Sequence, residues 1–274
     1  MKAKKSQLIL KRRKRRLKIV LIILGIVLLF FLIYWFIFLS NFFQIKEVNI
    51  LNSKEENQEE LLKEVNQYFQ KRNTKFVPLI IYKVLPQTRN NYRNMLLFSK
   101  EGLAKFIKNN HPEIKQINAS ISVSKQILTI EVIFREIEYL FCEKEECYLV
   151  DKVGVVFEKA PSVSGSLIKI INSPVSLKIK LGSTLFTKDF WQKIDKYYFL
   201  FDKPDSPLKI RSIIIDPNNL NSIKIKTEEG WFLYLDLKEN PEYILKIVSQ
   251  IKEERNLSKI EYLDCRFLPK IYLK

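Results

Sequence analysis

The chain has 274 residues, of which 47% are hydrophobic, so it is long and apolar enough to form more than one folded core. It contains 47 lysines and arginines against 30 acidic residues, but only one histidine and six glycines. A single histidine disfavours Ser/His/Asp catalysis and four-ligand zinc sites, and scarce glycine disfavours a Gly-rich phosphate loop. The composition therefore predicts a protein without enzymatic activity, bound metal or cofactor.

The first forty residues predict a single membrane anchor. A helix over the unbroken apolar run at 19–39 would rise about 1.5 Å per residue and reach about 30 Å, the thickness of a bilayer's hydrocarbon core. The preceding tail has no acid and ten basic residues: Lys2, Lys4, Lys5, Lys11, Arg12, Arg13, Lys14, Arg15, Arg16 and Lys18. Because positive charge stays inside during insertion, we expect a cytoplasmic tail at 1–18, a transmembrane helix at 19–40 and an extracytoplasmic remainder. A cleaved signal peptide is the alternative, but residues 40–44 contain no small-x-small cleavage site.

The formal charge of +17 is divided unequally by this anchor. Without the ten basic residues of the tail, 37 basic and 30 acidic residues remain, a surplus of seven. These basic residues form no aromatic-interleaved stripe along the sequence, so they predict at most a weak attraction to an acidic envelope polymer and no nucleic-acid partner. A small-molecule substrate is not expected either. The lipid bilayer is expected to contact residues 19–40 and, through anionic headgroups, the basic tail.

Residues 41–138 predict a first domain with elements in the order strand, helix, helix, strand, strand. Short β-branched runs predict strands at 45–51, 117–123 and 127–134. The first helix is expected after a capping box that begins at Asn57, and the second between a Ser99 cap and His111. An insertion around 74–92 separates the two helices. It either contacts the membrane surface or a partner, or folds over the domain.

Residues 139–274 predict a second, β-rich domain. Strands are expected at 139–141, 148–150, 155–157, 167–171, 210–216, 223–227 and 231–235. Two helices interrupt them, one capped by Thr187 and one that follows Pro241, and each carries an apolar stripe suited to a core. The predicted fold class is therefore α+β, with one transmembrane helix ahead of two domains.

Three cysteines lie beyond the anchor, where an oxidising compartment permits disulfides. Cys142 and Cys147 flank the polar turn of a predicted hairpin. A bridge between them is a hypothesis that requires Cα atoms within about 4.4 to 6.8 Å of each other. Cys265 alternates with Leu263 and Phe267 and is expected to be a buried, small apolar residue.

The order of these elements resembles the FtsQ/DivIB cell-division family, in which a cytoplasmic tail and one membrane helix precede a POTRA domain and a β-rich domain. Residues 128–136 resemble the family's last POTRA strand. In the family this strand runs into a Glu-Arg-x-Pro motif, and of the Glu-Arg pair only the arginine, Arg135, is present here. Residues 149–157 are similar to its Val-Asp-x-x-Gly-x-x-Phe signature, in which Asp151 and Gly154 form a hairpin turn ahead of Phe157. The closing Asp-Leu-Arg-Phe strand of the family resembles residues 262–267.

This resemblance implies a single-pass scaffold of the divisome, located in the cell membrane at the septum, that links division proteins outside the cytoplasm. The implied partners are coiled-coil proteins of the FtsB/FtsL type. An exposed edge strand is expected to receive the partner, with Pro269 leaving that edge free. The candidate binding residues are Tyr262, Asp264, Arg266, Phe267, Ile271 and Tyr272. The alternative function is that of a membrane-anchored POTRA protein in secretion or envelope assembly.

Overall fold

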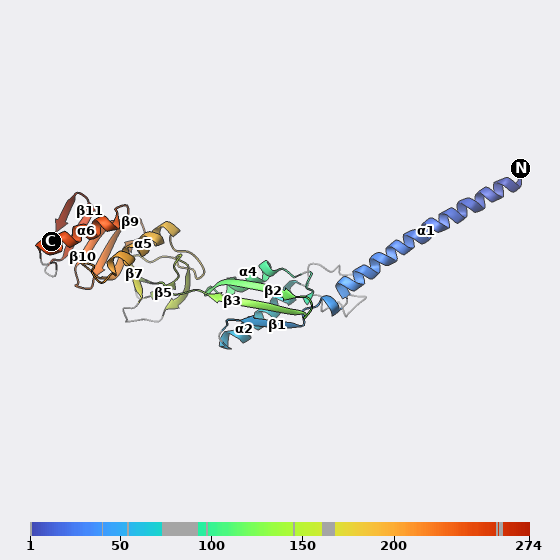
Figure 1. The fold of residues 1–274 in the computed structure, drawn as a ribbon, viewed down its shortest axis with the longest axis horizontal. Helices are drawn as coiled ribbons and strands as arrows, with labels where there is room; N and C mark the ends of the chain where they lie inside the picture. The colour runs from blue at the N-terminus through green and yellow to red at the C-terminus, as the bar shows by residue number, and fades with distance from the viewer. Residues whose placement is uncertain are drawn as a thin grey trace. The chain divides into compact units, whose positions relative to one another are not determined.

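The computed structural model describes residues 2–39, 41–53, 55–72, 93–96, 98–144, 146–160, 168–255, 257 and 260–274 (Figure 1). The chain divides into two compact units, which are Met1–Ile107 with Gln116–Val132, and Lys108–Lys115 with Ile133–Lys274. The larger unit therefore begins before residue 139 and also takes in a short segment from within the predicted first domain. The predicted insertion around 74–92 lies outside the described residues.

The N-terminal helix α1 spans Lys2–Leu39. Within it, Arg16–Ile37 is long and apolar enough to cross a membrane, and none of this stretch is buried against other parts of the protein. The helix begins at Lys2 and not at the apolar run, because lysine, arginine and leucine are all good helix formers and no proline interrupts them. The basic tail is thus a continuation of the apolar helix.

The smaller unit contains a three-stranded sheet in the order β1-β3-β2, in which β1 runs parallel to β3. The apolar stripes of its two helices are buried, with Val65 and Phe69 on one helix and Leu103 and Ile107 on the other. Besides α1, its described elements are the 3₁₀ helix η1 (Asn41–Phe43), β1 (Glu47–Leu51), α2 (Glu55–Arg72), and most of α4 (Lys100–Asn110), β2 (Ile114–Ser122) and β3 (Ile127–Phe134). The last residues of α4 and β3 and the first two of β2 belong to the larger unit.

Two local predictions for this unit have different outcomes. The Ser99 cap is confirmed, because its Oγ accepts a hydrogen bond of 3.0 Å from the backbone N–H of Gly102. The capping box at Asn57 is wrong, since α2 already begins at Glu55 and Asn57 lies inside the helix. Glutamates are good helix formers and favourable in a first turn, so Glu55 and Glu56 start the helix ahead of the box.

The larger unit is built on a nine-stranded sheet in the order β12-β11-β10-β9-β8-β7-β4-β5-β6. Every strand predicted between residues 139 and 235 is present, with ends shifted by at most a few residues. The strands are β4 (Tyr139–Glu143), β5 (Glu146–Val150), β6 (Val156–Ala160), β7 (Lys169–Ser173), β8 (Ile210–Asp216), β9 (Asn219–Thr227), β10 (Phe232–Asp236), β11 (Tyr262–Phe267) and β12 (Lys270–Leu273).

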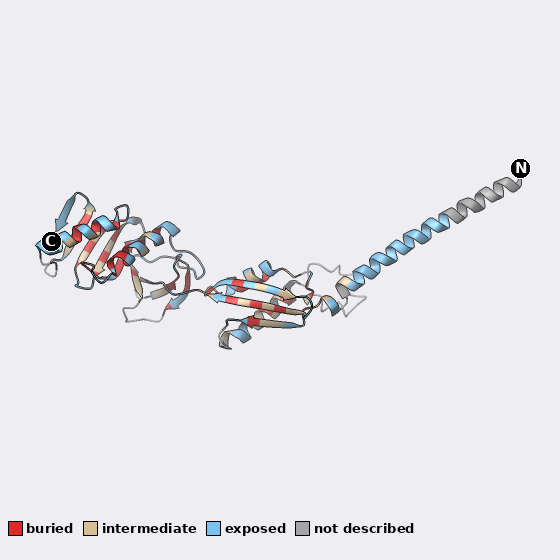
Figure 2. Cartoon of the chain, in the orientation of Figure 1, coloured by how far each residue is buried: buried red, intermediate tan, exposed pale blue. Residues whose placement is uncertain are grey.

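Helices α5 (Lys188–Phe201) and α6 (Pro241–Glu254) pack on one face of this sheet and form the main core with it (Figure 2). Thr187 caps α5 by accepting a hydrogen bond from the backbone N–H of Phe190, and Asn240 caps α6, which has Pro241 in its first turn. The core includes Trp191 and Ile244 from the helices, and Ile213, Ile225, Leu233 and Leu263 from the strands. Cys265 is buried in the same core, as predicted.

The face opposite α5 and α6, which we call the outer face, has two different parts. Around β4, β5 and β6 it is apolar, with buried Leu140, Leu149, Phe157 and Ala160. From β4 across the sheet to β11, strand pairing places one row of side chains of this face in register: Cys142, Asn172, Ile214, Lys224, Tyr234 and Asp264. The outer face is therefore apolar near β4 and carries polar, charged and aromatic groups near β10.

The turn between β5 and β6 follows the signature that the sequence suggested. Asp151 Oδ1 accepts hydrogen bonds from the backbone N–H groups of Val153 and Val155, at 3.0 and 2.9 Å. Gly154 adopts a φ of 88°, and β5 pairs antiparallel with β6. The other oxygen of Asp151 accepts a 2.5 Å ion-pair bond from Arg135, whose Nε donates to the carbonyl of Pro112 at 2.9 Å. Arg135 and Asp151, two separate motif residues, thus form one buried clamp.

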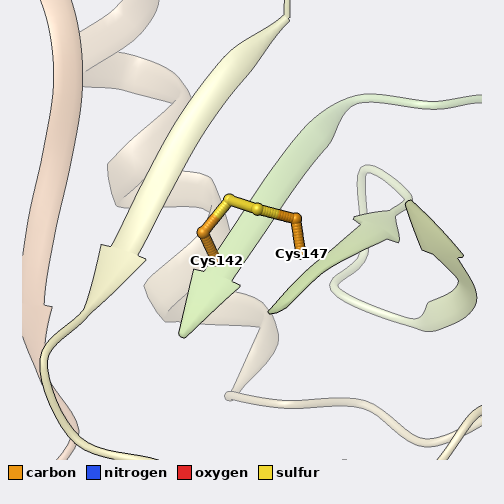
Figure 3. The surroundings of a disulfide bond; sticks show 2 residues. All are labelled: Cys142 and Cys147. Carbon is orange, nitrogen blue, oxygen red and sulfur yellow. A yellow bond between two sulfur atoms is a disulfide. The ribbon is translucent and has the colours of Figure 1, made fainter. Parts of the chain in front are cut away.

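Cys142 and Cys147 form a disulfide across the β4–β5 hairpin (Figure 3). They lie directly opposite each other in the ladder, with Cα atoms 4.1 Å apart. This separation is slightly shorter than the lower limit that the sequence hypothesis required. The bond lies beside the apolar cluster on the outer face.

Alkylation of the denatured full chain without reductant is expected to label one thiol, that of Cys265, and prior reduction should raise the number to three. Replacing both bridged cysteines with serine should lower the free energy of unfolding by about 2 kcal/mol, because the bridge closes only a short loop. Intact mass and thermal unfolding measure the two effects. Three labels before reduction would exclude the bridge.

Candidate interaction edge

Strand β12 forms one edge of the nine-stranded sheet, and among the strands that the structure describes it pairs with β11 alone. All four of its residues are exposed, as Figure 2 shows. Of the predicted binding residues, Ile271 and Tyr272 lie on this edge strand. The interpretation of 262–267 as the edge is wrong, because β11 pairs with β10 on one side and β12 on the other. Pro269 lies in the turn between β11 and β12 and does not free an edge.

The register decides which backbone groups of β12 point away from β11, at the open edge of the sheet. Lys274 and Tyr262 exchange two N–H···O bonds, of 3.2 and 3.3 Å, so they form a hydrogen-bonded pair of the antiparallel ladder. The next pair, Leu273 opposite Leu263, is then a non-hydrogen-bonded pair. The N–H and C=O groups of Leu273 consequently point away from β11. These groups are available to a further strand.

Aromatic side chains surround this edge. The ring of Tyr272 meets that of Phe267 edge to face, with centroids 6.1 Å apart, and both residues are more than half exposed. One strand further in, Tyr262 packs edge to face on Tyr234 at 5.6 Å. Exposed rings beside an open strand edge supply apolar contact area that a partner can bury.

Asp264 and Arg266 are occupied with each other. Arg266 Nη2 and Nε donate to the two carboxylate oxygens of Asp264 at 2.5 and 2.9 Å, and the Arg266 backbone N–H donates at 3.0 Å. Burial by itself would raise the pKa of Asp264, but the hydrogen bonds and charge of Arg266 outweigh it and hold the pKa below its ordinary value. Asp264 therefore orients Arg266 and is not itself a free contact for a partner.

The lowered pKa of Asp264 predicts a dependence of stability on pH. A carboxyl whose folded-state pKa is depressed stabilises the fold above its ordinary pKa of 3.8 and loses that contribution as pH falls through the folded-state value. The difference in melting temperature between the natural chain and an Asp264→Asn variant should thus be constant near neutral pH and shrink below pH 3.8. A difference that stays constant in acid would contradict the role of the ion pair.

The remaining residues singled out in the sequence lie elsewhere in the larger unit. Arg135, Asp151 and Gly154 belong to the clamp beside the β5–β6 turn, while Phe157 packs in the outer-face cluster near the disulfide. Sequence reasoning missed Leu273, whose N–H and C=O groups point away from β11 at the sheet edge. It also missed the side chains that Lys224, Phe232 and Tyr234 present on the outer face.

The chain matches no protein-family model, and no curated protein is significantly similar to it.

Proposed function

We propose that this protein is a single-pass scaffold of the bacterial divisome, with a cytoplasmic N-terminus and two extracytoplasmic domains, the first of the POTRA type. The observation that carries the proposal is the free edge of β12, which lies next to the strand that resembles the closing strand of the FtsQ/DivIB family. Residues 262–274 thus combine the family-like motif with an exposed edge strand.

Two further observations support the proposed placement. One helix is long and apolar enough to anchor the chain, and the basic residues of its N-terminal part favour a cytoplasmic N-terminus. The disulfide between Cys142 and Cys147 is typical of an oxidising, extracytoplasmic compartment. Both agree with a protein that works outside the cytoplasm while attached to the membrane.

The proposed mode of binding is strand addition to β12. A partner strand would bond to the outward N–H and C=O groups of Leu273, and its alternate side chains would contact the rings of Phe267 and Tyr272. Coiled-coil division proteins of the FtsB/FtsL type are the proposed partners. The larger unit would hold them close to the septal membrane and would carry out no chemistry itself.

The first test follows a fluorescent fusion to the N-terminus of the full chain in dividing cells. The proposal expects a band at the constriction that appears as the septum forms. A uniform membrane signal from a functional fusion would contradict a role in division and would favour the alternative role in secretion or envelope assembly.

A second test separates the edge from the fold. Leu273→Pro removes an N–H that β11 does not use, so the sheet should survive while strand addition is blocked. We expect this variant to keep its own septal band but to lose the band of a fluorescent FtsB/FtsL-type partner. The matched variant Leu273→Val keeps the N–H and should retain both. Loss of the partner in both variants, or in neither, would contradict binding through the backbone of β12.

A further inference from the structure

The outer face carries a group of cations and rings that lies apart from the β12 edge. Lys224 and Lys226 of β9 stand directly opposite Tyr234 and Phe232 of β10, and all four side chains are half-buried on this face. Strand alternation separates them from the inward residues Ile225 and Leu233, which pack beneath α5 and α6. We call these four residues the lysine–aromatic patch.

Ring faces hold the ammonium groups of this patch. Lys224 Nζ lies 3.8 Å from the centroid of Phe232 and 5.1 Å from that of Tyr234, and Lys226 Nζ lies 5.9 Å from Phe232. A cation over a ring is attracted by the negative face of the π system, which restricts a side chain that otherwise has many rotamers. Both charges are thereby positioned before any ligand arrives.

The charges of the patch are not neutralised within the described part of the chain. Neither Lys224 nor Lys226 forms an ion pair with a described carboxylate, whereas the neighbouring Arg266 is paired with Asp264. Lys169, elsewhere in the larger unit, shows the contrasting arrangement, since it bonds both Glu138 and Asp195. Two adjacent ammonium groups without a counter-charge favour an anionic ligand.

The sheet around the patch restricts the kind of ligand. Strands β9, β10 and β11 each have a paired neighbour on both sides, so their backbones are not open to a peptide strand here. Recognition must come from side chains alone. Because Lys224 and Lys226 are two residues apart on one strand, their Cα atoms lie about 7 Å apart. This spacing suits successive charges of an extended polymer.

We propose that the lysine–aromatic patch binds a linear polyanion whose phosphates are joined through short carbon units, as in poly(glycerol phosphate). The inference goes beyond the scaffold function, because it assigns a second surface on different strands to a ligand that is not a protein. Binding there leaves the β12 edge open. The protein can accordingly hold an anionic polymer and a partner strand at the same time.

The test uses the full chain in phosphatidylcholine vesicles oriented with residues 41–274 outside, so that the basic tail is enclosed. Binding of labelled poly(glycerol phosphate) is measured over a range of salt concentrations. Lys224→Gln with Lys226→Gln should weaken binding about tenfold. It should also make the slope of log K against log salt shallower by roughly 1.4, if each lost phosphate contact counts about 0.7 as it does for single-stranded nucleic acid. The melting temperature should fall by no more than a few degrees, because the substitutions remove only the cation–π contacts of two half-buried side chains.

The matched control is Lys178→Gln with Lys180→Gln. These lysines have the same spacing and lie in the same unit, but they are exposed and contact no ring in the described residues. The control removes the same charge and should leave affinity and slope nearly unchanged. Equal losses in the two double variants would show that only net charge matters and would overturn the proposal.

Two competitors distinguish the source of the phosphate. Free glycerol phosphate at the same phosphate concentration should compete poorly; effective competition would indicate a single-anion site and contradict polymer binding.

Vesicles that contain phosphatidylglycerol present the same group on a membrane. Loss of binding to those vesicles in the Lys224/Lys226 variant, with polymer binding intact, would assign the patch to lipid and overturn the proposal. The β12 variant Leu273→Pro should bind the polymer normally. A failure of the polymer-binding proposal can therefore be told apart from a failure of the strand-addition proposal.

Discussion

Gly154→Ala is expected to destabilise the larger unit by about 3 to 4 kcal/mol, which should lower its melting temperature by about 10 °C. A methyl group added at Gly154 would lie 1.8 Å from Nε1 of Trp191, and the positive φ of 88° adds backbone strain. Trp191 cannot move aside, because it is buried against Tyr139 and Phe190. Its fluorescence, together with that of the buried Trp231, reports unfolding of this unit directly.

Gly230→Ala is the matched control for this effect. Gly230 also has a positive φ, of 100°, but an added methyl group would meet no atom within 4 Å. The control therefore isolates the backbone strain, about 1 to 2 kcal/mol. Equal destabilisation by the two substitutions would mean that contact with Trp191 contributes nothing, and our account of the Gly154 turn would be wrong.

Arg135→Met is expected to cost about 3 kcal/mol of stability, because it leaves the carboxylate of Asp151 buried without its counter-charge. The two side chains are only 12% and 7% exposed, and Arg135 also satisfies the carbonyl of Pro112. Methionine keeps most of the aliphatic volume, so the loss reports the charge and its hydrogen bonds. Chemical denaturation of the full chain, followed by tryptophan fluorescence, measures it.

Lys159→Met supplies the comparison for this ion pair. Lys159 and Glu146 are also 2.5 Å apart, but their side chains are 58% and 51% exposed. Solvent screens such a pair, so the substitution should have little effect. The two variants differ mainly in burial. If Arg135→Met were as mild as Lys159→Met, the clamp would not stabilise the β5–β6 turn.

The secondary structure of this chain was largely predictable because its causes are local. Alternation of β-branched residues indicated β3 and β8 to the residue, and caps at Ser99 and Thr187 marked helix starts correctly. The error at Asn57 has the same local origin, since Glu55 and Glu56 compete with the capping box as helix starters. Such signals act over a few residues and need no knowledge of the fold.

The candidate interaction edge was only half predictable. The resemblance of residues 262–267 to a family's closing strand pointed to the right segment, but the edge was assigned to β11 when it belongs to β12. The identity of an edge depends on which strand pairs on each side. The parallel neighbour of β11 is β10, and the two are separated in the sequence by the whole of α6. No pattern within residues 262–267 reports that pairing.

The sequence by itself determined an N-terminal helix long and apolar enough to span a membrane, the order of the elements and the α+β class, because hydrophobic periodicity and helix caps are properties of neighbouring residues. Tertiary structure alone decided three pairings: Arg135 with Asp151, Gly154 with Trp191, and Lys224 with the rings of β10. The lysines form no aromatic-interleaved stripe along the chain, yet strand register places them over aromatic rings. The physical reason is that a sheet brings distant segments to a spacing of about 5 Å, so its surface chemistry follows from pairing and not from sequence order.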